Sequence, residues 1–293
     1  MTEAEPLTTY LELRESDEQG NEKAGLSHSS EGLVLFHVLE LAAWGEPKGG
    51  FTFVHDAGDH GGRYIELARG LTRANWAVAL PDLRGHGRSE GTRGHSNGLT
   101  EIVRDVQAVQ DHLAYRLPSA PKVLGGVGLG AIWALAYALE KPGSLAGLVL
   151  VSPTWKPSFE LPKPAGGLFK MFKKVGPDAP GRIGNDPTRW TPDAKEQAAL
   201  RADSAVHDVI TLRAGEQAIE TAARVGSRLG ELSIPVLVLH GADDAITPAA
   251  ESQRLAGAKA DVRVYPGGGH ALFHGAAAKQ ASDELRDWLA QRD

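Results

Sequence analysis

The chain of 293 residues contains no cysteine, which excludes disulfide bonds, thiolate catalysis and thiolate metal sites. Positive charge is scarce, because 31 Lys and Arg face 37 Asp and Glu and leave a net charge of −6. This balance argues against a nucleic-acid partner and favours a neutral or apolar ligand. No apolar run is long enough to cross a bilayer, and the N-terminus lacks a basic-then-apolar signal. We therefore expect a cytoplasmic protein without a transmembrane segment.

Short, continuous apolar runs alternate along the chain with helical patterns. Such runs are typical of strands buried on both faces of a parallel sheet, and their alternation with helices predicts βαβ units in an α/β fold. Amphipathic spacing predicts helices near residues 99–113 and 281–289. The predicted strands are Leu33–His37, Phe51–His55, Ala77–Leu80, Lys122–Gly126, Leu148–Ser152, Val236–His240 and Val262–Tyr265.

The pattern divides the chain into four parts. Residues 1–30 are polar and acidic, and we interpret them as a loose arm or an edge strand. Residues 31–154 and 231–293 carry the strand–helix alternation and are predicted to form one core. Residues 155–230 have Pro and Gly clusters and helical patterns but no good strand signal. We interpret this stretch as a helical cap inserted into the core.

The segment 122–142 reads as an apolar strand, a glycine-dense turn and a good helix. That context is typical of a nucleophile elbow, G-x-S-x-G, which needs small residues two places before and after the nucleophile. Gly126 and Gly130 occupy those places, but Gly128 stands where the nucleophile would be. A dinucleotide-binding turn is the alternative, but its glycine pattern is incomplete, because the last position is Ala131. We expect no cofactor.

Two later loops carry the residues that would accompany a nucleophile. In this type of fold the chain order is nucleophile, acid, histidine. Asp244 and His270 fit that order, each just after a predicted strand, with Asp243 as the neighbouring candidate for the acid. His240 and His270 could also form a zinc pair with Asp244, but the loop order explains these residues better. We expect no metal.

Two motifs resemble the monoacylglycerol lipase and lysophospholipase branch of the α/β-hydrolases. They are HxxGxHxxRY at residues 55–64 and DxxGHGxSEG at residues 82–91, and the segment 199–211 is similar to that branch as well. The resemblance covers about residues 35–290. It implies an α/β-hydrolase fold: a mostly parallel sheet of eight strands, flanked by helices, with a helical cap.

The chain departs from this branch at three positions. The branch has His-Gly after its third strand and G-H-S-M-G at its elbow, whereas this chain has Asp56 after His55, and Val127 and Gly128 in the elbow. Both departing stretches also resemble the N-myc downstream-regulated proteins, an α/β-hydrolase-fold family regarded as non-catalytic. The resemblance therefore implies a site in which Gly128 is a vacated nucleophile position and Asp56 and Val127 are altered lining residues.

What such a site could still do is open from the sequence. The oxyanion hole would be the backbone N–H groups of Leu129 and Ala57. The Asp56 carboxylate either points inward and opposes a developing oxyanion, or points to solvent as a turn residue. The favoured reading is a pseudo-hydrolase that binds a small neutral, acyl-like molecule. The alternative is a carboxylic ester hydrolase, which either uses water activated by His270 and Asp244 or was inactivated by an engineered change at position 128.

The predicted cap gives two indications of what the protein binds, namely the kind of ligand and a possible contact with a membrane. Its residues Phe169, Met171 and Phe172, with the net acidic charge, favour an acyl-like guest over a polyanion. The mixed apolar and basic segment 168–174 reads either as a helix packed on the core or as a lid in weak contact with a membrane. The sequence gives no signal for a protein partner or for an oligomeric state.

Overall fold

The computed structural model of the chain describes residues 5–15, 33–163, 175–253, 255 and 260–292. The segment 168–174, and with it Phe169, Met171 and Phe172, lies outside these residues, so its predicted membrane contact stays a prediction. Among helices in the described ranges, none is long and apolar enough to span a bilayer.

The core is an eight-stranded sheet in the order β1-β2-β4-β3-β5-β6-β9-β10. β1 and β2 pair antiparallel, β2 pairs antiparallel with β4, and the remaining neighbours are parallel. All seven strands predicted from apolar runs are present, and the mostly parallel sheet is confirmed. The strands are β1 Leu7–Arg14, β2 Leu33–Leu41, β3 Gly49–Val54, β4 Trp76–Pro81, β5 Lys122–Val127, β6 Gly147–Val151, β9 Val236–Gly241 and β10 Ala260–Tyr265.

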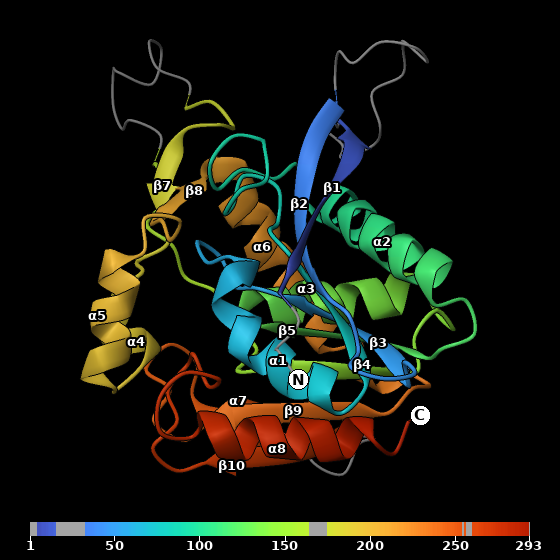
Figure 1. Cartoon of the computed structure of the whole chain (residues 1–293). Helices are drawn as coiled ribbons and strands as arrows, with labels where there is room; N and C mark the ends of the chain where they lie inside the picture. The colour runs from blue at the N-terminus through green and yellow to red at the C-terminus, as the bar shows by residue number, and fades with distance from the viewer. Residues whose placement is uncertain (1–4, 16–32, 164–174, 254, 256–259, 293) are drawn as a thin grey trace, which may run out of the picture.

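Helices cover both faces of this sheet (Figure 1). α1 (Ile65–Arg73) and α8 (Ala278–Leu289) pack together on one face, where they bury one apolar cluster with the strands. α2 (Leu99–Arg116), α3 (Leu129–Glu140) and α6 (Leu212–Gly226) cover the other face and bury the larger cluster. A short α7 (Ala249–Gln253) follows β9. Both helices predicted from amphipathic spacing are confirmed as α2 and α8.

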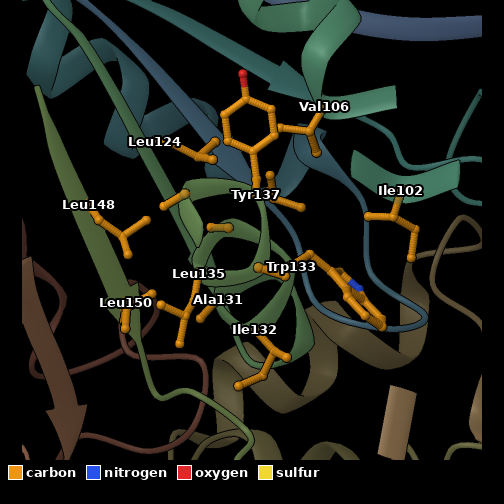
Figure 2. Packing of buried hydrophobic residues seen from close by; sticks show 14 of the residues in the cluster. Ile102, Val106, Leu124, Ala131, Ile132, Trp133, Leu135, Tyr137, Leu148 and Leu150 are labelled. Atoms are coloured by element: carbon orange, nitrogen blue, oxygen red, sulfur yellow. The ribbon is translucent and has the colours of Figure 1, made fainter. Parts of the chain in front are cut away.

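α3 lies at the centre of the larger cluster because its sequence is apolar on every side. All residues from Leu129 to Ala138 are buried, as expected for a helix enclosed by neighbours. Figure 2 shows its side chains between Leu124, Leu148 and Leu150 of the sheet and Ile102 and Val106 of α2. This packing fixes the N-terminus of α3 against the ends of β3 and β5, where the candidate site lies.

The stretch 155–230 differs from its prediction in one respect. It contains two three-residue strands, β7 (Pro180–Arg182) and β8 (Val209–Thr211), which form a small antiparallel sheet. Three residues are too few to give a periodic signal, so the expectation of no strand was wrong here. The other elements of the stretch are α4 (Pro187–Trp190), α5 (Ala194–Ala202) and α6. β7, α4 and α5 lie at the left of Figure 1. α6 packs on α3.

Candidate active site

The turn between β5 and α3 brings strand and helix very close together. Gly128 alone separates them and has φ 58° and ψ −120°, a conformation that side chains rarely adopt without strain. A Cβ on Gly130 would lie 2.3 Å from the carbonyl oxygens of Val54 and His55. A Cβ on Gly126 would lie 2.3 Å from the carbonyl oxygen of Gly130. The glycines predicted from the elbow pattern are therefore required by the backbone itself.

The carboxylate of Asp56 points inward to this turn. Its Oδ1 accepts hydrogen bonds from the backbone N–H groups of Ala57 at 2.8 Å and Leu129 at 2.7 Å. These are the two donors that the sequence predicts as an oxyanion hole. A Cβ on Gly128 would lie 2.2–2.3 Å from the carboxylate atoms, so Asp56 fills the space where a side chain at position 128 would stand. Of the two orientations left open, the structure has the inward one.

The other carboxylate oxygen of Asp56 lies 3.0 Å from Nε2 of His270. Nδ1 of His270 lies 2.8 Å from Oδ2 of Asp244, so the imidazole is placed between two carboxylates. Asp244 is fixed in turn, because its Oδ1 accepts from the backbone N–H groups of Ile246 and Thr247 at 2.7 and 2.9 Å. The structure thus brings together Asp56, His270, Asp244 and the Gly128 turn from four separate loops.

Charge at this centre is set by burial and by the two carboxylates. Burial opposes the charged form of His270, but Asp244 and then Asp56 raise the pKa of the imidazole to about 10. Although burial raises the pKa of Asp244, the charge of His270 and several hydrogen bonds hold it well below its usual range. At neutral pH His270 is therefore an imidazolium that donates one N–H to each carboxylate.

Two further histidines support this arrangement, and neither was predicted as a site residue. His240 places Nε2 3.1 Å from Oδ2 of Asp244 and Nδ1 2.8 Å from Oγ of Ser252. His55 donates from Nδ1 to the carbonyl oxygen of Asp56 at 2.6 Å, because its Nε2 accepts from the backbone N–H of Leu83 at 2.8 Å. Burial lowers the pKa of His55 and keeps it neutral. His55 therefore holds the backbone from which the Asp56 carboxylate projects.

Other residues singled out in the sequence lie away from this centre. Val127, expected to line the site, is 2% exposed and belongs to the apolar cluster on the α1 and α8 face, since successive strand residues point to opposite faces. Asp243, the alternative acid, accepts from the backbone N–H of Gly267 at an exposed position. Ser152, at the end of the predicted strand Leu148–Ser152, is fully buried, and its hydroxyl has no hydrogen-bond partner among the residues that the structure describes.

A cavity of about 50 Å³ opens beside the site. Ala57 and Leu129, whose N–H groups hold Asp56, form part of its wall. Apolar side chains make up about half of the rest of the lining, and the polar groups come from Arg84, His86, His95, Ser96, Glu101, Asp105 and Gln217. The apolar lining residues are Leu83, Ile102, Trp133, Ile183, Val209, Ile210, Ala214 and Ala218.

A parallel sheet flanked by helices, with an elbow turn after β5 and an acid and a histidine after β9 and β10, defines an α/β-hydrolase. The family described as serine aminopeptidase, S33 (Hydrolase_4) matches residues 45–276, and this chain belongs to it.

Several of the relatives are named as monoglyceride lipases. A monoacylglycerol lipase of Mycolicibacterium smegmatis is 30% identical over 251 residues, 83% of this chain and 89% of that protein. The human monoglyceride lipase is 29% identical over 265 residues, 85% of this chain and 84% of that protein. The crystal structure of a Paleococcus ferrophilus monoacylglycerol lipase, 25% identical, covers 88% of this chain and 99% of that one with a TM-score of 0.76. The chain is thus a monoglyceride-lipase-like α/β-hydrolase.

Proposed function

We propose that this protein is a hydrolase-fold protein without a serine nucleophile, and that it binds a small, neutral, acyl-like molecule. The observation that carries the proposal is the position of the Asp56 carboxylate. It occupies both N–H donors of the oxyanion hole and the volume that a side chain on residue 128 would need. A serine acyl-enzyme requires both of these places.

The occupied hole also opposes ester hydrolysis by any nucleophile that attacks a substrate carbonyl. The donors of an oxyanion hole act only when they are aimed at the place where negative charge develops. Here the N–H groups of Ala57 and Leu129 already hold an anionic oxygen. A substrate carbonyl near Asp56 would gain charge beside a fixed carboxylate, which raises the energy of the transition state.

The charge of His270 bears on the alternative in which this residue activates water. A general base must have a free lone pair within reach of the water. Both nitrogens of His270 face carboxylates, and with a pKa of about 10 the ring carries both protons at neutral pH. This arrangement supports the pseudo-hydrolase proposal over the water-activation one.

The fit between Asp56 and Gly128 bears on whether position 128 was changed by engineering. A single engineered change would leave an empty space above an otherwise ordinary site. Instead, the carboxylate of Asp56 fills that space with three short hydrogen bonds. The pair is mutually adapted, which supports a natural loss of the nucleophile.

The cavity and the proposed cap favour an apolar ligand. Ligand sites in open α/β sheets lie outside the carboxyl ends of the strands, and an apolar cleft with a few polar groups is the usual form. The cavity beside Ala57 and Leu129 has this character, and Ile183, Val209 and Ile210 of the proposed cap, residues 155–230, form part of its wall. This lining favours an acyl or alkyl chain over a charged group.

A fluorophosphonate probe tests the proposal directly. We expect no stoichiometric adduct on the wild-type protein by intact-mass spectrometry and peptide mapping. The double variant Asp56→Gly/Gly128→Ser, which reopens the hole and supplies a hydroxyl, is the positive control. A stoichiometric adduct on Ser152, or on any serine next to the cavity of the wild-type chain, would overturn the assignment.

A further inference from the structure

We propose that the cavity is gated by pH, and that protonation of His207 releases the part of its wall that contains Val209 and Ile210. Access to the cavity does not depend on whether residue 128 is a nucleophile, so this gate is independent of the proposed function. The observation that carries it is a stack of three histidine rings at this wall, two of which hold the wall as hydrogen-bond acceptors.

The three rings come from three separate segments of the chain. His55 follows β3, His86 lies in the turn after β4, and His207 precedes β8. The ring centroids of His55 and His86 are 5.1 Å apart, and those of His86 and His207 are 4.7 Å apart. Positive charges on neighbouring rings would repel each other strongly at these distances, because little solvent lies between them. The stack therefore favours neutral rings.

Two of these rings hold the cavity wall as acceptors. Nδ1 of His207 accepts from the backbone N–H of Val209 at 3.2 Å, and Nε2 of His55 accepts from that of Leu83 at 2.8 Å. Both donors belong to residues that line the cavity. In a charged ring both nitrogens carry a hydrogen, so Nδ1–H of a protonated His207 would face the N–H of Val209. Protonation therefore turns this attractive contact into a repulsive one.

The surroundings of the stack keep His207 neutral at neutral pH. Burial, followed by the charge of Arg93 and the neighbouring His55, lowers the pKa of His207 to about 4. Asp208, the next residue in the chain, opposes this shift without cancelling it. Burial and the two flanking rings also hold the pKa of His86 well below its ordinary value. The wall is therefore closed by neutral rings.

His55 is the innermost ring of the stack. Burial lowers its pKa, the charges of Asp59 and Asp82 raise it, and that of His60 lowers it. The side chain of His55 is fully buried, whereas His207 is partly exposed. Water therefore reaches His207 first, and this outer ring is the one that takes up the proton.

The wall segment is seated on the core through a few backbone contacts. The N–H of His207 donates to the carbonyl oxygen of Gly58 at 2.8 Å, and the N–H of Thr211 donates to that of Gly94 at 3.0 Å. A Cβ on either glycine would overlap a carbonyl oxygen of this segment, so the two backbones meet directly. The two lining residues of β8 stand between these anchors. Loss of the His207 contact therefore weakens the wall at one of its two anchors.

The direction of the pH dependence follows from the lowered pKa of His207. The ring has a pKa of about 4 with the wall in place and returns to its ordinary value of 6.5 once it is released into water. The open form therefore binds more protons, and the closed form loses stability as the pH falls from 6.5 towards 4. Between pH 8 and pH 5 the fraction of open molecules should rise by about tenfold, since partial exposure screens part of the effect.

A single introduced cysteine tests the gate, because the chain has none of its own. Ala218→Cys places a thiol at the cavity wall, and Ile219→Cys places one at an exposed position of the same helix, α6. Both are labelled with N-cyclohexylmaleimide, an uncharged reagent that is too bulky for a cavity of about 50 Å³. The ratio of the two rates removes the pH dependence of the thiol itself. We expect this ratio to rise by about tenfold from pH 8 to pH 5, and a ratio that stays constant would overturn the inference.

Two variants in the Ala218→Cys and Ile219→Cys backgrounds assign the effect to His207. His207→Gln keeps an acceptor for the N–H of Val209 but does not titrate, so the ratio should become independent of pH. His112→Gln is the matched control, because His112 pairs with Glu40 outside the cavity lining, and it should keep the rise. A rise in His207→Gln as large as in the parent chain would contradict the gate, as would its loss in His112→Gln.

Hydrogen exchange of the unmodified protein separates local opening from unfolding. After correction for the intrinsic pH dependence of exchange, the amides of Val209 and Thr211 should lose protection at pH 5, while those of β6 and β9 keep theirs. Equal loss in all of these amides would mean acid unfolding and would remove the gate. A fluorophosphonate adduct on a serine of the wild-type protein would remove the proposed function and leave this result unchanged.

Discussion

The carboxylate of Asp56 lies where a side chain on Gly128 would have to be. A Cβ built on Gly128 comes within 2.2–2.3 Å of three carboxylate atoms, far inside van der Waals contact. The two residues are 72 positions apart in the sequence, yet they compete for the same space. Aspartate at position 56 in this pose requires glycine at position 128, and this relationship governs the first prediction.

Gly128→Ser should lower the free energy of unfolding and restore little esterase activity. The positive φ of residue 128 costs about 1–3 kcal/mol for a side chain, and the overlap with Asp56 adds to it. Adding Asp56→Gly removes the overlap, so the double variant should recover part of the stability and gain activity. Urea unfolding and turnover of a short-chain ester measure both effects.

Gly143→Ser is the matched control for this series. Gly143 also has a positive φ, 82°, but a Cβ there meets nothing within 4 Å. Gly143→Ser should therefore lower the free energy of unfolding only by the cost of a side chain at a positive φ. Two results together would show that the overlap with Asp56 has no consequence. Gly128→Ser would lower the free energy of unfolding by no more than Gly143→Ser does, and it would turn over ester at the rate of the double variant.

The stability of the protein should fall as the pH rises through about 10. His270 has a folded-state pKa of about 10, above its ordinary value of 6.5, because Asp244 and Asp56 outweigh burial. Its contribution is therefore fully present below pH 6.5 and is lost as the pH approaches and passes 10. Unfolding free energies of the wild type and His270→Gln, measured across this range, should converge towards the alkaline end. A difference in unfolding free energy that stays constant with pH would contradict a charged His270 between Asp56 and Asp244.

Removing one partner of the buried ion pair between Arg84 and Asp105 should lower the free energy of unfolding strongly. Replacing the charged groups together by uncharged side chains should lower it much less. Arg84 binds both carboxylate oxygens of Asp105, at 3.0 and 2.7 Å, next to the cavity. Asp105→Ala leaves a buried guanidinium with less compensation and should cost about 3–5 kcal/mol in urea unfolding. Arg84 also lies 3.6 Å from the buried carboxylate of Glu101, so the matched replacement is the triple change Arg84→Met/Glu101→Gln/Asp105→Leu, which should cost much less. A triple variant as unstable as the single one would contradict this reasoning.

A neutral monoglyceride or medium-chain alcohol should raise the melting temperature. Ligand at a hundredfold excess over Kd stabilises the folded state by about 2.7 kcal/mol. Leu129→Trp fills the cavity that Leu129 lines and should abolish the shift. Ile219→Trp, at an exposed position of α6, is the control and should keep it. Equal shifts in both variants would place the ligand elsewhere.

Much of the fold could be predicted because its signals are local. Each buried strand is a continuous apolar run, and α2 and α8 show their faces as amphipathic spacing. The loops that carry Asp244 and His270 follow such strands, so their meeting could be inferred from the order of elements. β7 and β8 are too short for a periodic signal, and they pair across a separation of more than 25 residues in the stretch 155–230.

The orientation of Asp56 could not be predicted, because it depends on contacts with distant residues. Its acceptor atoms are satisfied by Leu129 and His270, which are far away in the chain. His240 was considered beside Asp244 only as a zinc ligand, and its direct contact with that carboxylate was not predicted, since a histidine that ends a strand has no distinctive pattern. Val127 was misplaced because a change of residue type does not say which face of the strand it occupies.

The fit of Asp56 over Gly128 also makes the two positions interdependent in evolution. With any side chain at position 128, an aspartate at position 56 would have no room for this pose. A serine at position 128 would meet the seated carboxylate directly. Substitution of Gly128 is therefore selected against for as long as Asp56 keeps this pose.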